Sequence, residues 1–139
     1  RSASASSHSL LAEKYSRWLQ DKTGGFRAFI TWTYQPGNTE LGGKKTSGWD
    51  YMKTLALSRL YMDNIKHIQG SWVTQGERIG QLTLGFGGDD LGSIMLEENV
   101  VRAAGTSYDM SINKMVNMIR GAGRKPAQRN TKYEIIKRF

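Results

Sequence analysis

Cysteine is absent from this chain of 139 residues. Without a thiol, the chain contains no disulfide, no cysteine nucleophile and no cysteine ligand for an iron–sulfur cluster. Long apolar runs are absent as well, because no segment approaches the roughly 20 residues of a membrane-spanning helix and no signal-peptide core opens the sequence. We therefore expect a soluble, cytoplasmic protein without a membrane segment.

Several motifs that carry chemistry are also missing. The sequence has no P-loop, no GxGxxG fingerprint and no HExxH motif, which removes the usual support for a phosphate cradle or a zinc hydrolase. The glycine-rich LGFGG stretch is better explained as a packing turn than as a phosphate loop. His67 stands where a strand is expected to begin, and a structural role fits it better than that of a base.

Acidic residues are outnumbered, with 12 Asp and Glu against 20 Lys and Arg, and the net charge is +8. The excess is concentrated in the final stretch, residues 119–139. A solvated basic surface is the favoured interpretation. Binding of RNA or another polyanion is the alternative, although nucleic acid is an improbable partner because only Tyr133 and Phe139 interleave with the cations.

The composition itself is that of one globular domain, with 38% hydrophobic residues, four Trp and six Tyr. Residues 1–9 are rich in serine and are expected to be a disordered leader or an expression remnant. The folded unit is expected to be residues 10–139.

Hydrophobic spacing predicts an alternation of strands and helices along this unit. In the second predicted helix, a face of apolar residues runs from Trp49 through Met52 and Ala56 to Leu60. Ser47 precedes Asp50 by three residues, as in a capping box. The pattern predicts helices at 10–22, 48–64, 77–86 and from 112 to 121, strands at 26–32, 67–76 and 91–96, and one further turn after Pro126.

Such alternation indicates parallel strands joined by right-handed crossovers. The predicted fold is α/β, the C-terminal half of an eight-stranded TIM-type barrel with about three βα units and a C-terminal helix. In these barrels the loops that follow the strands build the active site. The corresponding loops here are residues 33–41, 73–77 and 96–100, and all three are polar.

The first of these loops lies within the stretch TWTYQPGNTEL, residues 31–41. Pro36 and Gly37 suit a turn, but the aromatic and amide side chains around them are typical of a pocket for a polar small molecule. At the second loop Trp72 is either a pocket wall or plain core, and Gln75 has little structural reason to be there. At the third, a strand would direct Glu97 and Glu98 to opposite faces, so at most one enters a barrel.

The segments FITWTYQPGNTEL, SWVTQG, GDDLGSIMLEENVVRAAGT and QRNTKYE together resemble the C-terminal part of the cyclic dehypoxanthinyl futalosine synthase family, over about residues 10–136. This is a radical S-adenosylmethionine family of the futalosine route to menaquinone. Aminofutalosine synthase and the FO synthase subunits share the GDDLGS region, and a fragment of either is the alternative. The loops after the strands look more like the cyclase.

The resemblance implies a barrel that binds a [4Fe-4S] cluster and S-adenosylmethionine and converts dehypoxanthine futalosine to its cyclic product. The family holds its cluster through a CxxxCxxC motif in the N-terminal half of the barrel. Because this chain has no cysteine, we expect it to be inactive without that half, and to pair with it or to self-associate.

The same resemblance suggests roles for individual residues. Four residues with amide or hydroxyl side chains are expected to form hydrogen bonds with substrate or cofactor, and two tryptophans are expected to form aromatic walls of the pocket. Glu98 is the candidate base, because a carboxylate beside an apolar ring can have a raised pKa. Arg129 either binds the substrate carboxylate or fixes the C-terminal tail. The predicted binding residues are Gln35, Asn38, Thr39 and Gln75, with Trp32 and Trp72 as the walls.

Overall fold

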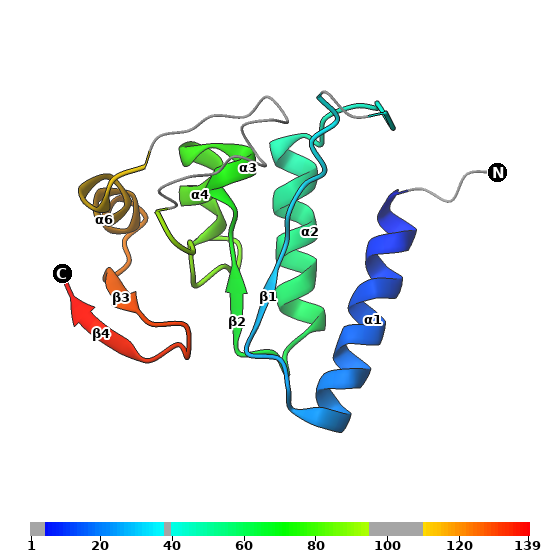
Figure 1. Cartoon of the computed structure of the whole chain (residues 1–139), viewed down its shortest axis with the longest axis horizontal. Helices are drawn as coiled ribbons and strands as arrows, with labels where there is room; N and C mark the ends of the chain where they lie inside the picture. Colours follow the sequence, from blue (N-terminus) through cyan, green and yellow to red (C-terminus); the bar gives the residue numbers. More distant parts are fainter. Residues whose placement is uncertain (1–4, 38–39, 95–109) are drawn as a thin grey trace.

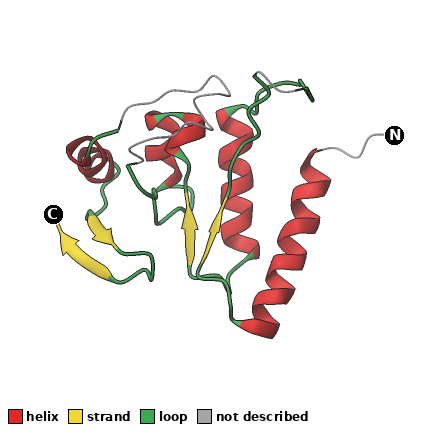
Figure 2. Ribbon diagram, in the orientation of Figure 1, coloured by secondary structure: helices red, strands yellow, loops and turns green. Residues whose placement is uncertain are grey.

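A computed structural model of the chain describes residues 5–37, 40–94 and 110–139. They form a mixed α/β structure with two short sheets (Figures 1 and 2). Figure 1 shows α1 and α6 at opposite ends of the molecule, with β1, β2 and α2 between them. In chain order the elements are α1 (Ala5–Thr23), β1 (Ala28–Ile30), α2 (Gly48–Tyr61), β2 (His67–Gln69), α3 (Trp72–Gln75), α4 (Glu77–Thr83), α6 (Ile112–Gly121), β3 (Ala127–Arg129) and β4 (Ile135–Arg138).

The first sheet is parallel, as the alternation of strands and helices predicts. Phe29 of β1 lies opposite Ile68 of β2, and Ile30 lies opposite Gln69. On the other side of β2, Asp90 forms an isolated parallel bridge with Gln69, and the Gly70 N–H donates to the Asp90 carbonyl at 2.9 Å. Three parallel chain segments therefore lie side by side.

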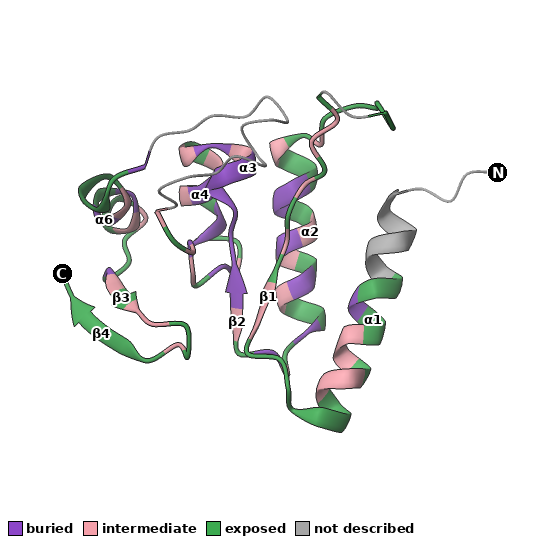
Figure 3. Ribbon diagram, in the orientation of Figure 1, coloured by how far each residue is buried: buried purple, intermediate pink, exposed green. Residues whose placement is uncertain are grey.

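One face of this sheet is covered by helices. Tyr51 and Leu55 of α2 pack on Ile68, with Phe29 and Ile79 beside them, and Leu55 and Ile68 are completely buried. Because side chains alternate along a strand, Phe29 and Ile68 point to the helices while Ile30 and Gln69 point to the opposite face. Figure 3 shows β2 among the buried parts of the molecule and β4 as exposed.

A second cluster of buried side chains joins α3, α4 and α6 to Leu91, which follows the third parallel segment. It includes Trp72 of α3, Leu84 after α4 and Met118 of α6. The spacing of apolar residues predicted α6, and its start is confirmed, because the Ser111 hydroxyl accepts from the Lys114 N–H at 3.3 Å. α4 is confirmed as well, entered from Gly76 at φ +83°.

The helix α1 packs along α2. It begins at Ala5, inside the stretch 1–9 that we expected to be a leader. Glu13 is buried against α2, where its Oε1 accepts from the Ser58 hydroxyl at 2.8 Å. The Arg17 guanidinium pairs with Asp63 at 2.5 Å just beyond the end of α2.

Three sequence predictions need correction. The predicted strand 67–76 ends at Gln69, because the Ser71 hydroxyl caps a short helix by accepting from the Thr74 N–H at 3.3 Å. Of the predicted strand 91–96, residues 91–94 form no strand, and residues 95–96 lie outside the described ranges. After Pro126 the chain forms the antiparallel pair β3–β4 rather than a further turn.

The buried face of α2 also differs from the prediction. Trp49 and Leu60 are largely exposed, whereas Tyr51, Leu55 and Ser58 are buried. The predicted cap is correct, since the Ser47 hydroxyl accepts from the Asp50 N–H at 3.1 Å. Among the described residues no helix combines the length and the apolar character that crossing a membrane requires, and no closed barrel is formed.

Candidate functional site

The face of the parallel sheet that α2 leaves uncovered forms one wall of a cleft of about 1620 Å³. At the carboxyl ends of the strands its lining includes Ile30, Trp32 and Gln69. Toward the amino ends the lining is charged and includes His67 and Asp89, whereas Asp90 lies level with Gln69. Ligands of parallel α/β sheets bind beyond the carboxyl ends of the strands, so the first of these two ends is the candidate site.

Trp32 follows β1 directly and lies in the cleft with about half of its surface (49%) exposed. It is therefore accessible from the cleft, and its predicted role as an aromatic wall stays a prediction. Ile30, also 49% exposed, stands two residues earlier on the same face of the strand. Together they give the cleft an apolar wall.

The predicted residues Gln35 and Gln75 meet on a third residue, Thr33. The Gln75 side-chain amide donates to the Thr33 hydroxyl at 2.8 Å, and that of Gln35 donates to the same oxygen at 3.0 Å. This arrangement joins the loop after β1 to the end of α3. The structure thus brings the two glutamines together, and Thr33, which the sequence reasoning missed, connects them.

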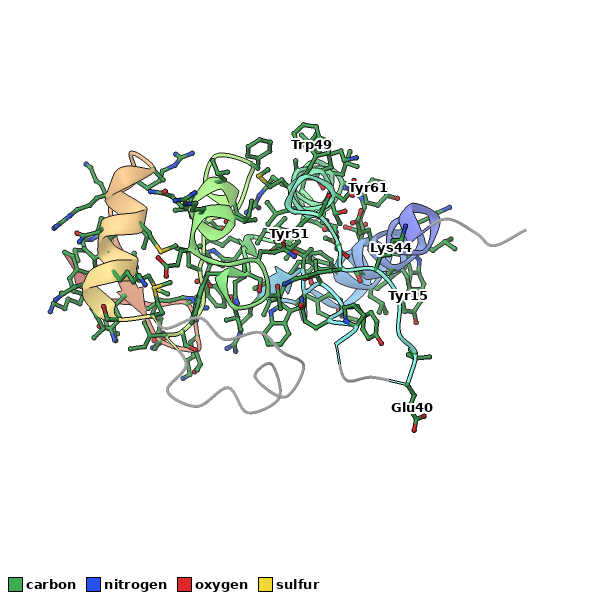
Figure 4. The ribbon with its side chains drawn as sticks, turned by 90° about the horizontal axis from the view of Figure 1, so that it is seen from above. Tyr15, Glu40, Lys44, Trp49, Tyr51 and Tyr61 are labelled. Atoms are coloured by element: carbon green, nitrogen blue, oxygen red, sulfur yellow. The ribbon has the colours of Figure 1, made fainter. Side chains whose placement is uncertain are left out.

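The carboxyl ends of β1 and β2 are also joined through a residue of α2, Tyr51. Its hydroxyl accepts from the Ser71 N–H at 2.7 Å and donates to the Thr31 carbonyl at 3.2 Å. Burial raises the pKa of Tyr51, although the hydrogen bonds with Thr31 and Ser71 act in the opposite direction. Figure 4 shows Tyr51 in the interior, whereas Glu40, from the predicted pocket loop, points away from the molecule.

Trp72 lies in the core, with only 2% of its surface exposed. Its indole N–H donates to the Ser93 carbonyl at 3.2 Å, which ties α3 to the segment that follows Asp90. Of the two interpretations left open by the sequence, core packing describes its surroundings. Its predicted role as an aromatic wall stays a prediction.

At the amino ends of the strands the charged groups are paired. Asp89 accepts from the Arg59 guanidinium at 2.6 Å, from the Ile68 N–H at 2.7 Å, and lies 2.6 Å from His67 Nδ1. These contacts join α2, β2 and the third parallel segment. They match the sequence interpretation of His67 as a structural residue.

Arg129 belongs to the same network. Its Nε donates to Asp90 at 2.7 Å, and its guanidinium lies 3.9 Å from the centre of the Tyr133 ring. The Tyr133 ring in turn stacks on His67, with the ring centres 4.3 Å apart. Arg129 thus fixes the C-terminal hairpin to the sheet, the second of the two roles considered for it.

The surroundings of Tyr133 raise the pKa of its hydroxyl. Burial raises the pKa of Tyr133 to about 12, and the negative charge of Asp90 adds to the increase, while Arg129 opposes it. Its backbone is also unusual, because Tyr133 has a positive φ of 66°. Its N–H donates to the Asn130 carbonyl at 3.1 Å in the turn between β3 and β4.

Three predicted site residues, Asn38, Thr39 and Glu98, lie outside the described ranges. Within those ranges no group of three or more His, Asp or Glu side chains is arranged to hold a metal ion. The site has one more polar side chain that the sequence reasoning missed, Gln69 at the end of β2.

Comparison with known proteins gives one family and several relatives. A family model described as the CofH/MqnC C-terminal region matches residues 23–138. The chain is 53% identical to a cyclic dehypoxanthine futalosine synthase of Streptomyces coelicolor over 85% of its length, and 52% identical to one of Halalkalibacterium halodurans over 88%. It is 43% identical over 91% to a 5-amino-6-(D-ribitylamino)uracil–L-tyrosine 4-hydroxyphenyl transferase of Methanococcus maripaludis. It spans about a third of these relatives, covering 30%, 34% and 38% of them.

Proposed function

The chain belongs to the family of the CofH/MqnC C-terminal region, and from that membership we propose that it is the C-terminal part of a cyclase acting on dehypoxanthine futalosine. The observation that carries the proposal is its identity, over most of its length, to two proteins named cyclic dehypoxanthine futalosine synthase. The proposed context is a radical S-adenosylmethionine barrel of the futalosine route. The three parallel segments would form part of that barrel.

The proposed contribution of this chain is to bind and orient the substrate. Trp32 and Ile30 supply an apolar wall at the carboxyl ends of the strands, and the Gln35–Thr33–Gln75 contacts hold the adjoining loop. Asn38, Thr39 and Glu98 keep their proposed roles in binding and proton transfer. A [4Fe-4S] cluster does not fit the residues of this chain, because the chain has no cysteine, so the cluster would be held by another part of the enzyme.

A chimera tests this proposal. The chain would replace the matching C-terminal segment of the Streptomyces coelicolor synthase, and the purified, anaerobically reconstituted protein would be given dehypoxanthine futalosine. We expect cyclic product, and none from the same protein without the segment. No product from a folded chimera, under conditions in which the intact synthase is active, would contradict the proposal. Activity on 5-amino-6-(D-ribitylamino)uracil and tyrosine would instead favour the transferase relatives.

A related proposal concerns the isolated chain. Among the described residues β1 pairs only with β2, so its other edge is open to a further strand. We propose that this edge receives the remaining barrel strands, or, in the isolated chain, a second copy. Light scattering at micromolar concentration would then report a dimer or larger species, whereas a compact monomer would contradict this part of the proposal.

A further inference from the structure

Gln69 occupies the central position on the uncovered face of the parallel sheet. It is the last residue of β2, with Ile30 of β1 on one side and Asp90 on the other. Its neighbour Ile68 points into the helix layer and is completely buried. Alternation therefore directs Gln69 into the cleft, whose lining includes it.

The side-chain amide of Gln69 makes no hydrogen bond to a described residue, and 7% of the residue's surface is exposed. Its polar atoms are not among the fully buried ones without a partner, so the amide keeps contact with solvent through the cleft. By contrast Gln35, Gln75 and Gln81 all donate from their amides to protein oxygens. The Gln69 amide is therefore free to bond a group that enters the cleft.

The amide packs closely against a neighbouring backbone. Gly92 has φ +74°, and a Cβ built on it would lie 2.6 Å from Gln69 Nε2, so a larger residue there would require the amide to move. Asp90 fixes the glycine by accepting its N–H at 2.8 Å. The space beside the amide is therefore kept by the backbone of a neighbouring segment.

From these contacts we propose that Gln69 is a ligand-binding residue whose amide recognises a group that both donates and accepts hydrogen bonds. Trp32 and Ile30 line the same cleft and are half exposed, so the ligand is a flat ring that packs on these side chains and turns a polar edge to Gln69. This inference rests on the proposed function, because dehypoxanthine futalosine is the ligand we expect to carry that edge.

The test compares two glutamine variants in the 139-residue chain. Gln69→Leu removes an unpaired amide, whereas the control Gln81→Leu removes one that donates to the Met118 carbonyl at 2.9 Å. In urea unfolding without ligand, we expect the midpoint of Gln69→Leu to equal or exceed that of the wild type and the midpoint of Gln81→Leu to fall. A fall for Gln69→Leu as large as that for Gln81→Leu would assign Gln69 a structural role and overturn the proposal.

The second measurement is binding of dehypoxanthine futalosine, followed by tryptophan fluorescence and by the NMR signals of the Gln69 side-chain amide. We expect Gln69→Leu to weaken binding about tenfold or more and Gln69→Glu, which keeps an acceptor but loses the donor, to weaken it less. Gln81→Leu should bind as the wild type does. Equal binding by Gln69→Leu, or no binding by the wild type, would overturn the inference. The chimera's turnover, measured without any variant, decides the proposed function separately.

Discussion

The two ends of the cleft differ in how their polar groups are used. Toward the amino ends of the strands Asp89 is matched by Arg59, and beside Gln69 Asp90 is matched by Arg129, which ties the C-terminal hairpin to the sheet. At the carboxyl ends the polar groups are amides and hydroxyls, and the amide of Gln69 is unpaired among the described residues. One region is held by paired charges, and the other offers the amides and hydroxyls that we propose bind the ligand, as the loops at the carboxyl ends do in parallel barrels.

The largest expected effect comes from breaking the ion pair between Asp90 and Arg129. Asp90→Ala leaves the half-buried Arg129 without its partner and removes the acceptor for the Gly92 N–H. We expect a loss of about 3 kcal/mol in the free energy of unfolding, measured by urea denaturation. Asp63→Ala, which removes an exposed pair with Arg17, is the control and should cost less than about 1 kcal/mol. Equal losses would show that the network is no more important than a surface pair.

At the other end, Tyr51→Phe tests how the strand ends are joined. The substitution keeps the ring that packs on Leu55 but leaves the buried Ser71 N–H without an acceptor. We expect a loss of about 2 kcal/mol in unfolding free energy. Tyr61→Phe, on the exposed side of α2, should be close to neutral. A neutral Tyr51→Phe would show that the hydroxyl does not hold the two strand ends.

A smaller effect is expected at Thr33. Thr33→Val retains the shape of the side chain and removes the oxygen that accepts from Gln35 and Gln75. We expect a loss of about 1 kcal/mol and altered NMR signals of both glutamine amides. Thr33→Ser keeps the oxygen and should leave those signals nearly unchanged. Unaltered signals in Thr33→Val would contradict the proposed link between the two loops.

The smallest expected effect depends on pH. The pKa of Tyr133 is about 12 in the folded chain and near 10 in the unfolded one, so its contribution is complete below pH 10 and is lost as the pH rises through 12. Because the ring is partly exposed, we expect this loss to be under about 1 kcal/mol. It would be measured as the difference between the wild type and Tyr133→Phe in unfolding free energy across that range. Parallel curves for the two proteins would contradict the shifted pKa.

Sequence reasoning predicted the parts of the fold that depend on neighbours in the chain. The cap at Ser47 is correct because its hydroxyl accepts from an N–H three residues later. The α/β character and the parallel pairing of β1 with β2 are also correct. It singled out Gln35 and Gln75 as candidate site residues but missed Thr33 and Gln69. Thr33 and Gln69 are common residue types in a strand or a loop, and their contacts come from segments far apart in the sequence.

What the sequence determined by itself was local: the helices α1, α2, α4 and α6, the turn residues, and the absence of cysteine that excludes a cluster from this chain. What only the tertiary structure decided was burial and pairing between segments far apart in sequence. The side of α2 that faces the core carries Tyr51 and Leu55, not Trp49 and Leu60, because the position of Ile68 in the sheet sets it. Likewise Gln69 becomes a candidate ligand-binding residue because Ile68 turns one way, Gln69 must turn the other, and Gly92 leaves room for its amide.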